Sequence, residues 1–481
     1  MALRAGMSPT PEPRPQPTTW LTLALLSLLA TQLGGCWGGR FCEHESLRKP
    51  CGTNKRGSSY SVCRDGEYGP YGECFDPDVC LDGAEQQTVC GLNGRGTGMT
   101  TCVLGHWGET RDCVDPDACR DGDWDQALCA SSTDSHSRQC VAGQWAPFGV
   151  CTAGPVLTIP VTGPRDMVHD AKRGRLYISS SGAGGTAGEV RGYDLMKRQS
   201  EPPLLTRQYT GPGSFLGIDL SPDEDLLAVA DNGWDDVYNH SNWAHLVDLR
   251  PVDRYYSRSG AYHFTLAPNE RGSFAVAWAS NTELLVTSSS TGTGAPLRRL
   301  DLSNGLPTGT IATVGPATLL ASAAGGAEVV YAQANASGGA WGRYHVYSHS
   351  FAGSTESSPV RDVAVNPTAT QFALATYDGL SIFNDVFSRQ ITLGAPAGQP
   401  VSAVYSPVAD ELYLAWAGAG ASIDVYSTAT FQKLRDIDPA PGLFSWTGSS
   451  ALDGGRLRIS RDGKLLFATT GSGVAVYLTG R

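Results

Sequence analysis

Residues 360–376 read Val-Arg-Asp-Val-Ala-Val-Asn-Pro-Thr-Ala-Thr-Gln-Phe-Ala-Leu-Ala-Thr, and this stretch shows how the larger part of the chain is built. Two runs rich in apolar residues flank the turn-forming pair Asn366-Pro367. Such a pattern predicts a β-hairpin. Leu380-Ser-Ile-Phe383 follows as a third predicted strand.

The same unit occurs seven times after residue 155. Each copy has a large apolar residue at the start of its second strand and further apolar residues eight positions before and two positions after it. The first large apolar residues are Leu176, Leu226, Leu284, Val329, Phe372, Leu412 and Leu465. Repeats of 40 to 58 residues with three or four strands each are typical of a β-propeller. The predicted fold is mainly β, a seven-bladed β-propeller, and a sandwich of short strands is the competing fold.

The ends of this region suggest how the ring closes. Val156-Leu-Thr-Ile-Pro160 lies outside the seven units, and the last unit ends at Arg481 with only three predicted strands. We expect the N-terminal segment to supply the fourth strand of the last blade. Closure of this kind removes two exposed sheet edges.

The Leu-Tyr-Ile, Val-Tyr and Tyr-Asp-Leu elements of the units resemble those of YVTN/lactonase-like seven-bladed propellers. The pairs Arg165-Asp166 and Arg361-Asp362 occupy the same position in their units, where the inner strands begin. This position predicts that Asp166 and Asp362 lie at the mouth of the central channel, a common ligand site in propellers. A salt bridge between neighbouring blades explains the pairs as well.

All 13 cysteines precede residue 152, and 12 of them form three groups of four with internal gaps of 9 to 12 residues. An even number of cysteines in small exported units predicts disulfides, with three pairings open in each group. A zinc site is the alternative, but the chain has no C-x2-C pair. The repeated C-x2-G-x-[W/Y] pattern resembles thrombospondin-type-1-like repeats, although the leading W-x2-W is absent. The predicted disulfide cysteines are Cys42, Cys51, Cys63, Cys74, Cys80, Cys90, Cys102, Cys113, Cys119, Cys129, Cys140 and Cys151.

The N-terminus predicts export. An uncharged apolar run over residues 20–30 follows a proline-rich region with Arg4 and Arg14, and it is too short for a comfortable membrane span. A buried core helix is the alternative, but the run has no polar face. Leu33-Gly-Gly-Cys36 resembles the lipobox of bacterial lipoproteins, which implies a lipid attached to Cys36 and a membrane anchor. Trp37, rather than Asp, follows Cys36, so the resemblance implies the outer membrane of the cell envelope, facing either the periplasm or the outside.

Three domains follow from these patterns. Residues 1–35 form a signal peptide, residues 36–154 form a cysteine-rich module of three repeats, and residues 155–481 form the propeller. The net charge of −11 argues against a nucleic-acid partner, because phosphate binding needs a basic surface.

No cofactor or metal is expected. The acids between Asp115 and Asp125 lack the glycine and the closing glutamate of an EF-hand, so loop acids are preferred over calcium ligands. The acids of residues 231–236 are likewise assigned to a polar insertion.

The sequence favours a binding module over an enzyme. A lactonase or lyase of propeller type would converge several His, Glu or Asp side chains in its channel, and the inner-strand position supplies only Asp166 and Asp362. Trp234, Tyr238 and Trp243 are the candidate contact patch for a protein or carbohydrate, since aromatic anchors dominate binding hot spots. Packing of the same rings in the core is the alternative.

Overall fold

The computed structural model describes residues 44–481 apart from several short stretches. The residues outside the description are 1–43, 130–133, 153, 182–186, 209–213, 234–242, 251–259, 266, 304–305, 324–325, 335, 337, 395–397, 419–421, 438–451, 453–454 and 481. Cys36, Cys42, Trp234 and Tyr238 therefore lie outside it, as does the apolar run of the predicted export signal. Among the described residues, no helix has the length and hydropathy to cross a membrane.

The described chain divides into two compact units, one up to Thr88 with Met99–Arg111, the other Val89–Gly98 with Asp112 onwards. The cysteine-rich repeats are built of short strands. These are β1 (Ser46–Cys51), β2 (Gly57–Arg64), β3 (Glu67–Tyr68), β4 (Glu85–Cys90), β5 (Gly96–Val103), β6 (His106–Trp107), β7 (Arg111–Val114), β8 (Trp124–Leu128), β9 (Ser135–Val141) and β10 (Gln144–Trp145).

Disulfides join the repeats internally. In the second and third groups the first cysteine is bonded to the third and the second to the fourth, and in the first group the second is bonded to the fourth. The bonds are Cys51–Cys74, Cys80–Cys102, Cys90–Cys113, Cys119–Cys140 and Cys129–Cys151. Cys63 is also disulfide-bonded. The region is disulfide-rich, and the structure selects one of the three pairings that the spacing left open.

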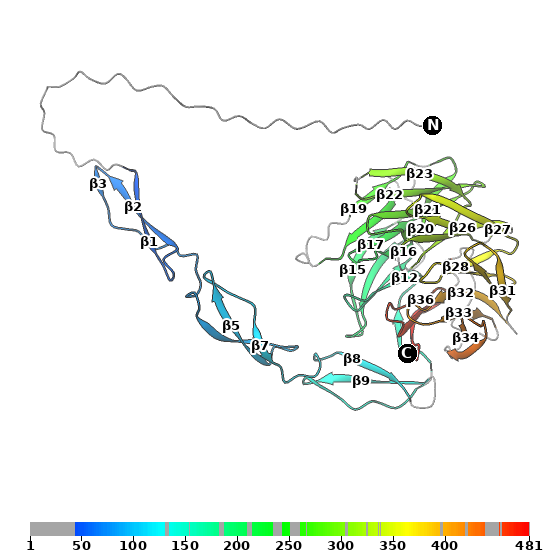
Figure 1. Ribbon diagram of the computed structural model, residues 1–481, viewed down its shortest axis with the longest axis horizontal. Helices are drawn as coiled ribbons and strands as arrows, with labels where there is room; N and C mark the ends of the chain where they lie inside the picture. Colours follow the sequence, from blue (N-terminus) through cyan, green and yellow to red (C-terminus); the bar gives the residue numbers. More distant parts are fainter. Residues whose placement is uncertain are drawn as a thin grey trace, which may run out of the picture. The chain divides into compact units, whose positions relative to one another are not determined.

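The second region is a seven-bladed β-propeller, as predicted, and each blade is a four-stranded antiparallel sheet. Blade 1 contains β12 (Pro164–Asp170), β13 (Arg175–Ser180), β14 (Ala187–Asp194) and β15 (Gln199–Gln208); blade 2 β16 (Phe215–Leu220), β17 (Leu226–Asp231), β18 (Trp243–Asp248) and β19 (Gly260–His263); blade 3 β20 (Glu270–Trp278), β21 (Glu283–Ser290), β22 (Ala295–Asp301) and β23 (Leu306–Val314); blade 4 β24 (Thr318–Ser322), β25 (Glu328–Gln333), β26 (Gly339–His345) and β27 (Ser350–Glu356); blade 5 β28 (Val360–Val365), β29 (Gln371–Thr376), β30 (Gly379–Asn384) and β31 (Arg389–Leu393); blade 6 β32 (Gln399–Tyr405), β33 (Glu411–Ala417), β34 (Ser422–Ser427) and β35 (Lys433–Ile437); blade 7 β36 (Leu457–Ile459), β37 (Leu465–Thr470), β38 (Gly473–Leu478) and β11 (Leu157–Pro160). Figure 1 shows these strands coloured in chain order, from cyan to red.

The last blade closes the ring as the sequence predicted. Strand β11 pairs antiparallel with β38, with Leu157 opposite Val476 and Ile159 opposite Val474. Ile159 is only 1% exposed. The two ends of the propeller are thereby held in one sheet, and no edge is left open at the junction.

The burial of the second strand of each blade explains why this strand is so rich in apolar residues. Phe372, Ala373, Leu374 and Ala375 in β29 are all fully buried, because this strand has a blade packed against each face. A strand buried on both faces carries a continuous apolar run rather than an alternating one. Small residues such as Ala373 and Ala375 let adjacent blades approach closely.

Several inner strands begin with a bulge. The register shifts between Pro164 and Asp166 in β12, and likewise at the start of β28 and β32. A bulge changes the direction of the side chains that follow it. These bulges set the positions of Asp166, Asp362 and Ser402, which belong to the site described next.

Candidate functional site

A cavity of ≈ 270 Å³ lies in the propeller where its inner strands end. All seven blades contribute to its wall. Representative lining residues, one from each blade in order, are Asp166, Asp219, Trp278, Ser322, Val363, Tyr405 and Arg458.

A buried arginine joins the two acids that the sequence singled out. Arg456 Nη1 lies 2.6 Å from Asp362 Oδ1, and Arg456 Nε lies 3.7 Å from Asp166 Oδ1. Asp166 also pairs with Arg458 Nη2 at 2.7 Å, and Asp362 accepts a hydrogen bond from the Ser402 hydroxyl. Asp166, Asp362 and Arg456 are each no more than 3% exposed. Blades 1, 5, 6 and 7 are thus linked through one polar network.

The two acids predicted to lie at the channel mouth, Asp166 and Asp362, therefore differ in their position relative to the cavity. Asp166 lines the cavity, whereas Asp362 is fully buried and bonded to Arg456. The cation that links the two acids was missed, because Arg456 stands one residue after Gly455, the position in blade 7 equivalent to Asp166. The network fits the inter-blade salt bridge that the sequence left open as the alternative reading.

Asp219 is a cavity acid that the sequence reasoning also missed. Its Oδ2 accepts hydrogen bonds from the backbone N of Trp278 and from the Ser322 hydroxyl, both at 2.8 Å. Its Oδ1 accepts from the backbone N of Leu220 at 2.9 Å. Burial raises the pKa of Asp219 to about 6 in spite of these hydrogen bonds. The group thus changes charge near neutral pH.

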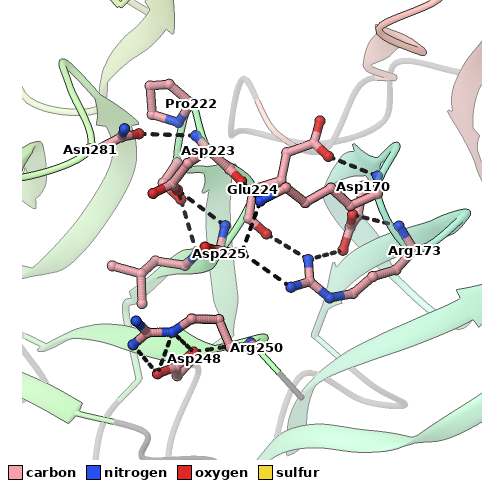
Figure 2. A network of polar contacts seen from close by, with 12 residues as sticks. Asp170, Arg173, Pro222, Asp223, Glu224, Asp225, Asp248, Arg250 and Asn281 are labelled. Carbon is pink, nitrogen blue, oxygen red and sulfur yellow. Dashed lines mark hydrogen bonds and ion pairs between the residues drawn. The ribbon is translucent and has the colours of Figure 1, made fainter. Parts of the chain in front are cut away.

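The rim of the cavity between blades 1 and 2 is a dense ion network (Figure 2). Arg173 Nη1 lies 3.0 Å from Asp170 Oδ2 and donates to the carbonyl of Glu224 at 2.6 Å. The Glu224 carboxylate accepts from the backbone N of Lys172 at 2.8 Å and pairs with Arg461 at 2.9 Å. Glu224 thereby connects blade 2 with blades 1 and 7.

Glu224 has a left-handed backbone with φ of 60°. Gly174 and Gly463 occupy the equivalent turn position in blades 1 and 7, with φ of 63° and 72°. A side chain in this conformation costs free energy that a glycine avoids, and such residues are retained where their contacts compensate. The contacts of Glu224 to both neighbouring blades account for its presence.

Two polar side chains of the cavity wall have no hydrogen-bond partner in the described part of the chain. They are Tyr405, whose hydroxyl is unbonded, and His169, whose Nδ1 is unbonded. Tyr405 is 5% exposed, and burial raises its pKa. Burial also lowers the pKa of His169, whose ring stacks on Phe467. Buried polar atoms without partners are rare and call for an explanation.

The aromatic patch is only partly described. Trp243 lies in β18, is partly buried, and its ring stacks on His245 with centroids 6.4 Å apart. His245 in turn bonds Asp231 Oδ2 at 3.0 Å, and Arg207 lies 2.6 Å from the same oxygen. Trp243 therefore packs within blade 2 and is not freely exposed. The Asp231 carboxylate contacts two side chains of the same chain, His245 and Arg207.

The junction acids of the cysteine-rich repeats form hydrogen bonds and ion pairs with the preceding loop. Asn93 Nδ2 donates to Asp117 Oδ2 at 2.7 Å and to the carbonyl of Cys119 at 2.8 Å. Arg95 pairs with Asp117 at 2.9 Å and with Asp121 at 3.1 Å, and its hydrogen bond lowers the pKa of Asp117. Equivalent contacts in the preceding repeat join Asn54 and Arg56 to Asp78, Cys80 and Asp82. An arginine of the preceding loop thus holds the buried Asp78 and Asp117, while Asp82 and Asp121 pair with the same arginines and remain 42% and 45% exposed.

Comparison with known proteins adds little beyond the fold. No family model matches the chain, and no curated protein matches it. Among solved structures, the chain is similar to the Dos1 propeller, with a TM-score of 0.49 and 12% identity over 66% of this chain and 79% of that one. It is also similar to a chain of a mitotic checkpoint complex, with a TM-score of 0.47 and 14% identity over 69% of this chain and 96% of the other.

Proposed function

We propose that this chain is an exported, membrane-anchored binding protein that recognises a protein or carbohydrate with the cavity-bearing face of its propeller. In this proposal the lipid is attached to Cys36, residues 36–154 act as a disulfide-bonded stalk, and residues 155–481 act as the recognition domain. The protein belongs in the cell envelope, at the outer membrane.

The observation that carries the proposal is that the two acids predicted at the channel mouth, Asp166 and Asp362, are buried in ion pairs. Asp166 and Asp362 are both held by arginines and are almost completely buried. A carboxylate in such a pair stabilises the ring and is a poor general base. The cavity, in contrast, has a wall of strand residues from all seven blades, in which Asp219 is partly exposed and forms no ion pair in the described chain. A preorganised surface of this kind reduces the ordering cost of binding.

The alternative is an enzyme of lactonase or lyase type, and one observation favours it. Asp219 has a pKa of about 6, within the range that suits a general acid–base group at neutral pH. Turnover of a lactone or lyase substrate that is lost in Asp219→Asn, with the fold intact, would replace the binding proposal.

Photo-crosslinking in intact cells tests which face of the propeller makes contacts. A benzoylphenylalanine is introduced into the full chain at Lys464 or at Ser472, two exposed positions that flank opposite ends of β37. Lys464 lies beside the turn that carries Arg461 of the cavity rim. We expect a defined crosslinked species from Lys464 and none from Ser472. Equal crosslinking at both positions, or none at either, would count against recognition by this face.

Anchoring is tested separately. Mass spectrometry of the mature protein should find an acylated Cys36 at its N-terminus. A soluble mature chain that begins elsewhere would overturn the anchor.

A further inference from the structure

The cavity wall contains three arginines and three acids, and the buried Asp362 behind it is a fourth acid, so the acids exceed the arginines by one. Each of the three arginines in its wall is matched by a carboxylate. The pairs are Arg456 with Asp362, Arg458 with Asp166 and Arg461 with Glu224. Asp219 is the remaining acid of the wall, and its three hydrogen-bond donors are two backbone N–H groups and a hydroxyl, all uncharged. In the described chain, no basic side chain forms an ion pair with Asp219.

A carboxylate without a cation is costly inside a protein. Burial penalises its charged form, and only a nearby positive charge or additional hydrogen bonds offset this penalty. Arg458 lowers the pKa of Asp219 only as the last of several contributions, after the hydrogen bonds from uncharged donors. The cavity therefore attracts a positive group to this position.

The same wall contains groups that suit the remainder of a ligand. Val168, Val365 and Val404 line the cavity and are only partly buried, and the Tyr405 hydroxyl is buried in the same wall without a partner. Apolar side chains beside a carboxylate suit a ligand that carries a cationic group on a hydrocarbon chain.

We propose that the cavity binds a small organic cation, whose ammonium or guanidinium group pairs with Asp219 while its apolar part packs against the partly buried side chains of Val168, Val365 and Val404. The proposal rests on the proposed function, in which this face of the propeller is the recognition surface. The volume of ≈ 270 Å³ is slightly below the roughly 300–1,000 Å³ typical of pockets for drug-sized ligands. The cavity thus admits a free small amine or one lysine or arginine side chain of a partner.

The arginines argue against an anionic ligand. An anion would have to displace Asp166, Asp362 or Glu224 from an existing ion pair, and each displaced acid would then be left buried without a cation. A cation at Asp219 disrupts none of these pairs.

Binding of a cation to Asp219 should depend on pH in a defined direction. The carboxyl must be ionised to pair with the ligand, and its pKa in the free protein is about 6. Affinity should therefore rise with pH and level off above neutrality, with about a tenfold loss between pH 7.5 and pH 5. Besides Asp219 and the three arginines, the titratable side chains that line the cavity are Asp166, His169, Glu224 and Tyr405.

Calorimetry with the full chain and defined probes tests the proposal. The probes are Nα-acetyl-lysinamide, its uncharged analogue Nα-acetyl-norleucinamide, and n-butylamine. At pH 7.5 we expect both amines to bind with dissociation constants on the order of millimolar and the norleucine derivative to show no binding. Equal binding of the two amines would indicate a free small amine as the ligand, and tighter binding of the lysine derivative would indicate a side chain of a partner.

Two variants locate the binding. Asp219→Asn keeps a hydrogen-bond acceptor for Trp278 and Ser322 but removes the charge, and it should weaken amine binding by about thirtyfold or more. Asp223→Asn is the matched control, because Asp223 belongs to the rim but not to the cavity wall, and it should bind amines as the wild type does. Circular dichroism confirms that both variants are folded.

Several results would overturn the cation site. These are no binding of either amine to the wild type, equal binding of the norleucine derivative, or unchanged amine binding in Asp219→Asn. Crosslinking from Lys464 is independent of these measurements, so loss of the cation site and loss of the proposed function are distinguishable.

Discussion

Replacement of Arg456 by methionine should destabilise the propeller strongly, because it removes the cation that links three blades. Arg456 is 2% exposed and lies 2.6 Å from Asp362 and 3.7 Å from Asp166. Asp166 retains Arg458 at 2.7 Å after the substitution, but Asp362 loses the one cation within ion-pair distance of it in the described chain, and Arg458 then acts on it only from farther away. Removing one partner of a buried ion pair costs about 3–5 kcal/mol, since the other charge remains buried and uncompensated.

A second substitution isolates the cause of that loss. In Arg456→Met/Asp362→Asn the orphaned charge is absent, while the asparagine still offers an acceptor to the backbone N of Val363. We expect this double variant to recover most of the loss and to lie within about 1–2 kcal/mol of the wild type.

The assay is urea denaturation of the full chain at pH 7 with its disulfides intact. Tryptophan fluorescence and circular dichroism are recorded together, because coincident transitions justify a single free energy of unfolding. A loss below about 1 kcal/mol in Arg456→Met, or a double variant no more stable than the single one, would refute the inference that a buried charge network holds the blades.

Three further changes test the ring, the cavity acid and the disulfides. Ile159→Ala should lower the free energy of unfolding by about 2–5 kcal/mol, while Thr158→Ala on the exposed side of the same strand should change it by less than about 0.5 kcal/mol; similar effects of both would contradict ring closure by β11. Asp219→Asn should raise the melting temperature at pH 7.5 but not below pH 4. The reason is that the raised pKa of Asp219, about 6 against 3.8, makes its ionisation cost up to about 3 kcal/mol of stability as the pH rises through that range; an equal effect at both pH values would contradict this assignment. Thiol titration of the denatured, unreduced protein should detect no free thiol among the 12 repeat cysteines, and any reactive thiol among them would contradict the disulfide framework.

The fold was predictable because its repeat is directly visible in the sequence. The apolar residue at the start of each second strand, such as Leu176 or Phe372, is buried in five of the seven units and partly buried in the other two, so its spacing marks the repeat. The added strand that contains Ile159 was predictable because the last unit has only three predicted strands where a blade needs four. Both features depend on local patterns and on the need to leave no sheet edge open.

The site was predictable only in part, because its side chains meet across the ring. Asp166 and Asp362 share a position in their units, but their common partner Arg456 is one residue out of register and comes from a different blade. Asp219 occupies the position three residues later in its own blade, and nothing in the local sequence distinguishes it from a surface acid. Its significance arises from burial and from the lack of a matching cation, which are properties of the assembled ring.

The pairing of the cysteines illustrates the same limit. The gaps between them showed that four cysteines form one unit, yet three pairings were equally consistent with those gaps. The bonds Cys80–Cys102 and Cys90–Cys113 follow from which strands lie together in the folded repeat.

The carboxyl group of Asp219 offers the most direct test of recognition through the propeller cavity. Its ¹³Cγ resonance can be followed between pH 4 and pH 8 in the full chain, with and without saturating Nα-acetyl-lysinamide. A cation bound beside the carboxylate must stabilise its ionised form, so we expect a pKa near 6 in the free protein and a clearly lower pKa in the presence of the amine. A pKa that is the same with and without the amine would show that no cation binds at this acid.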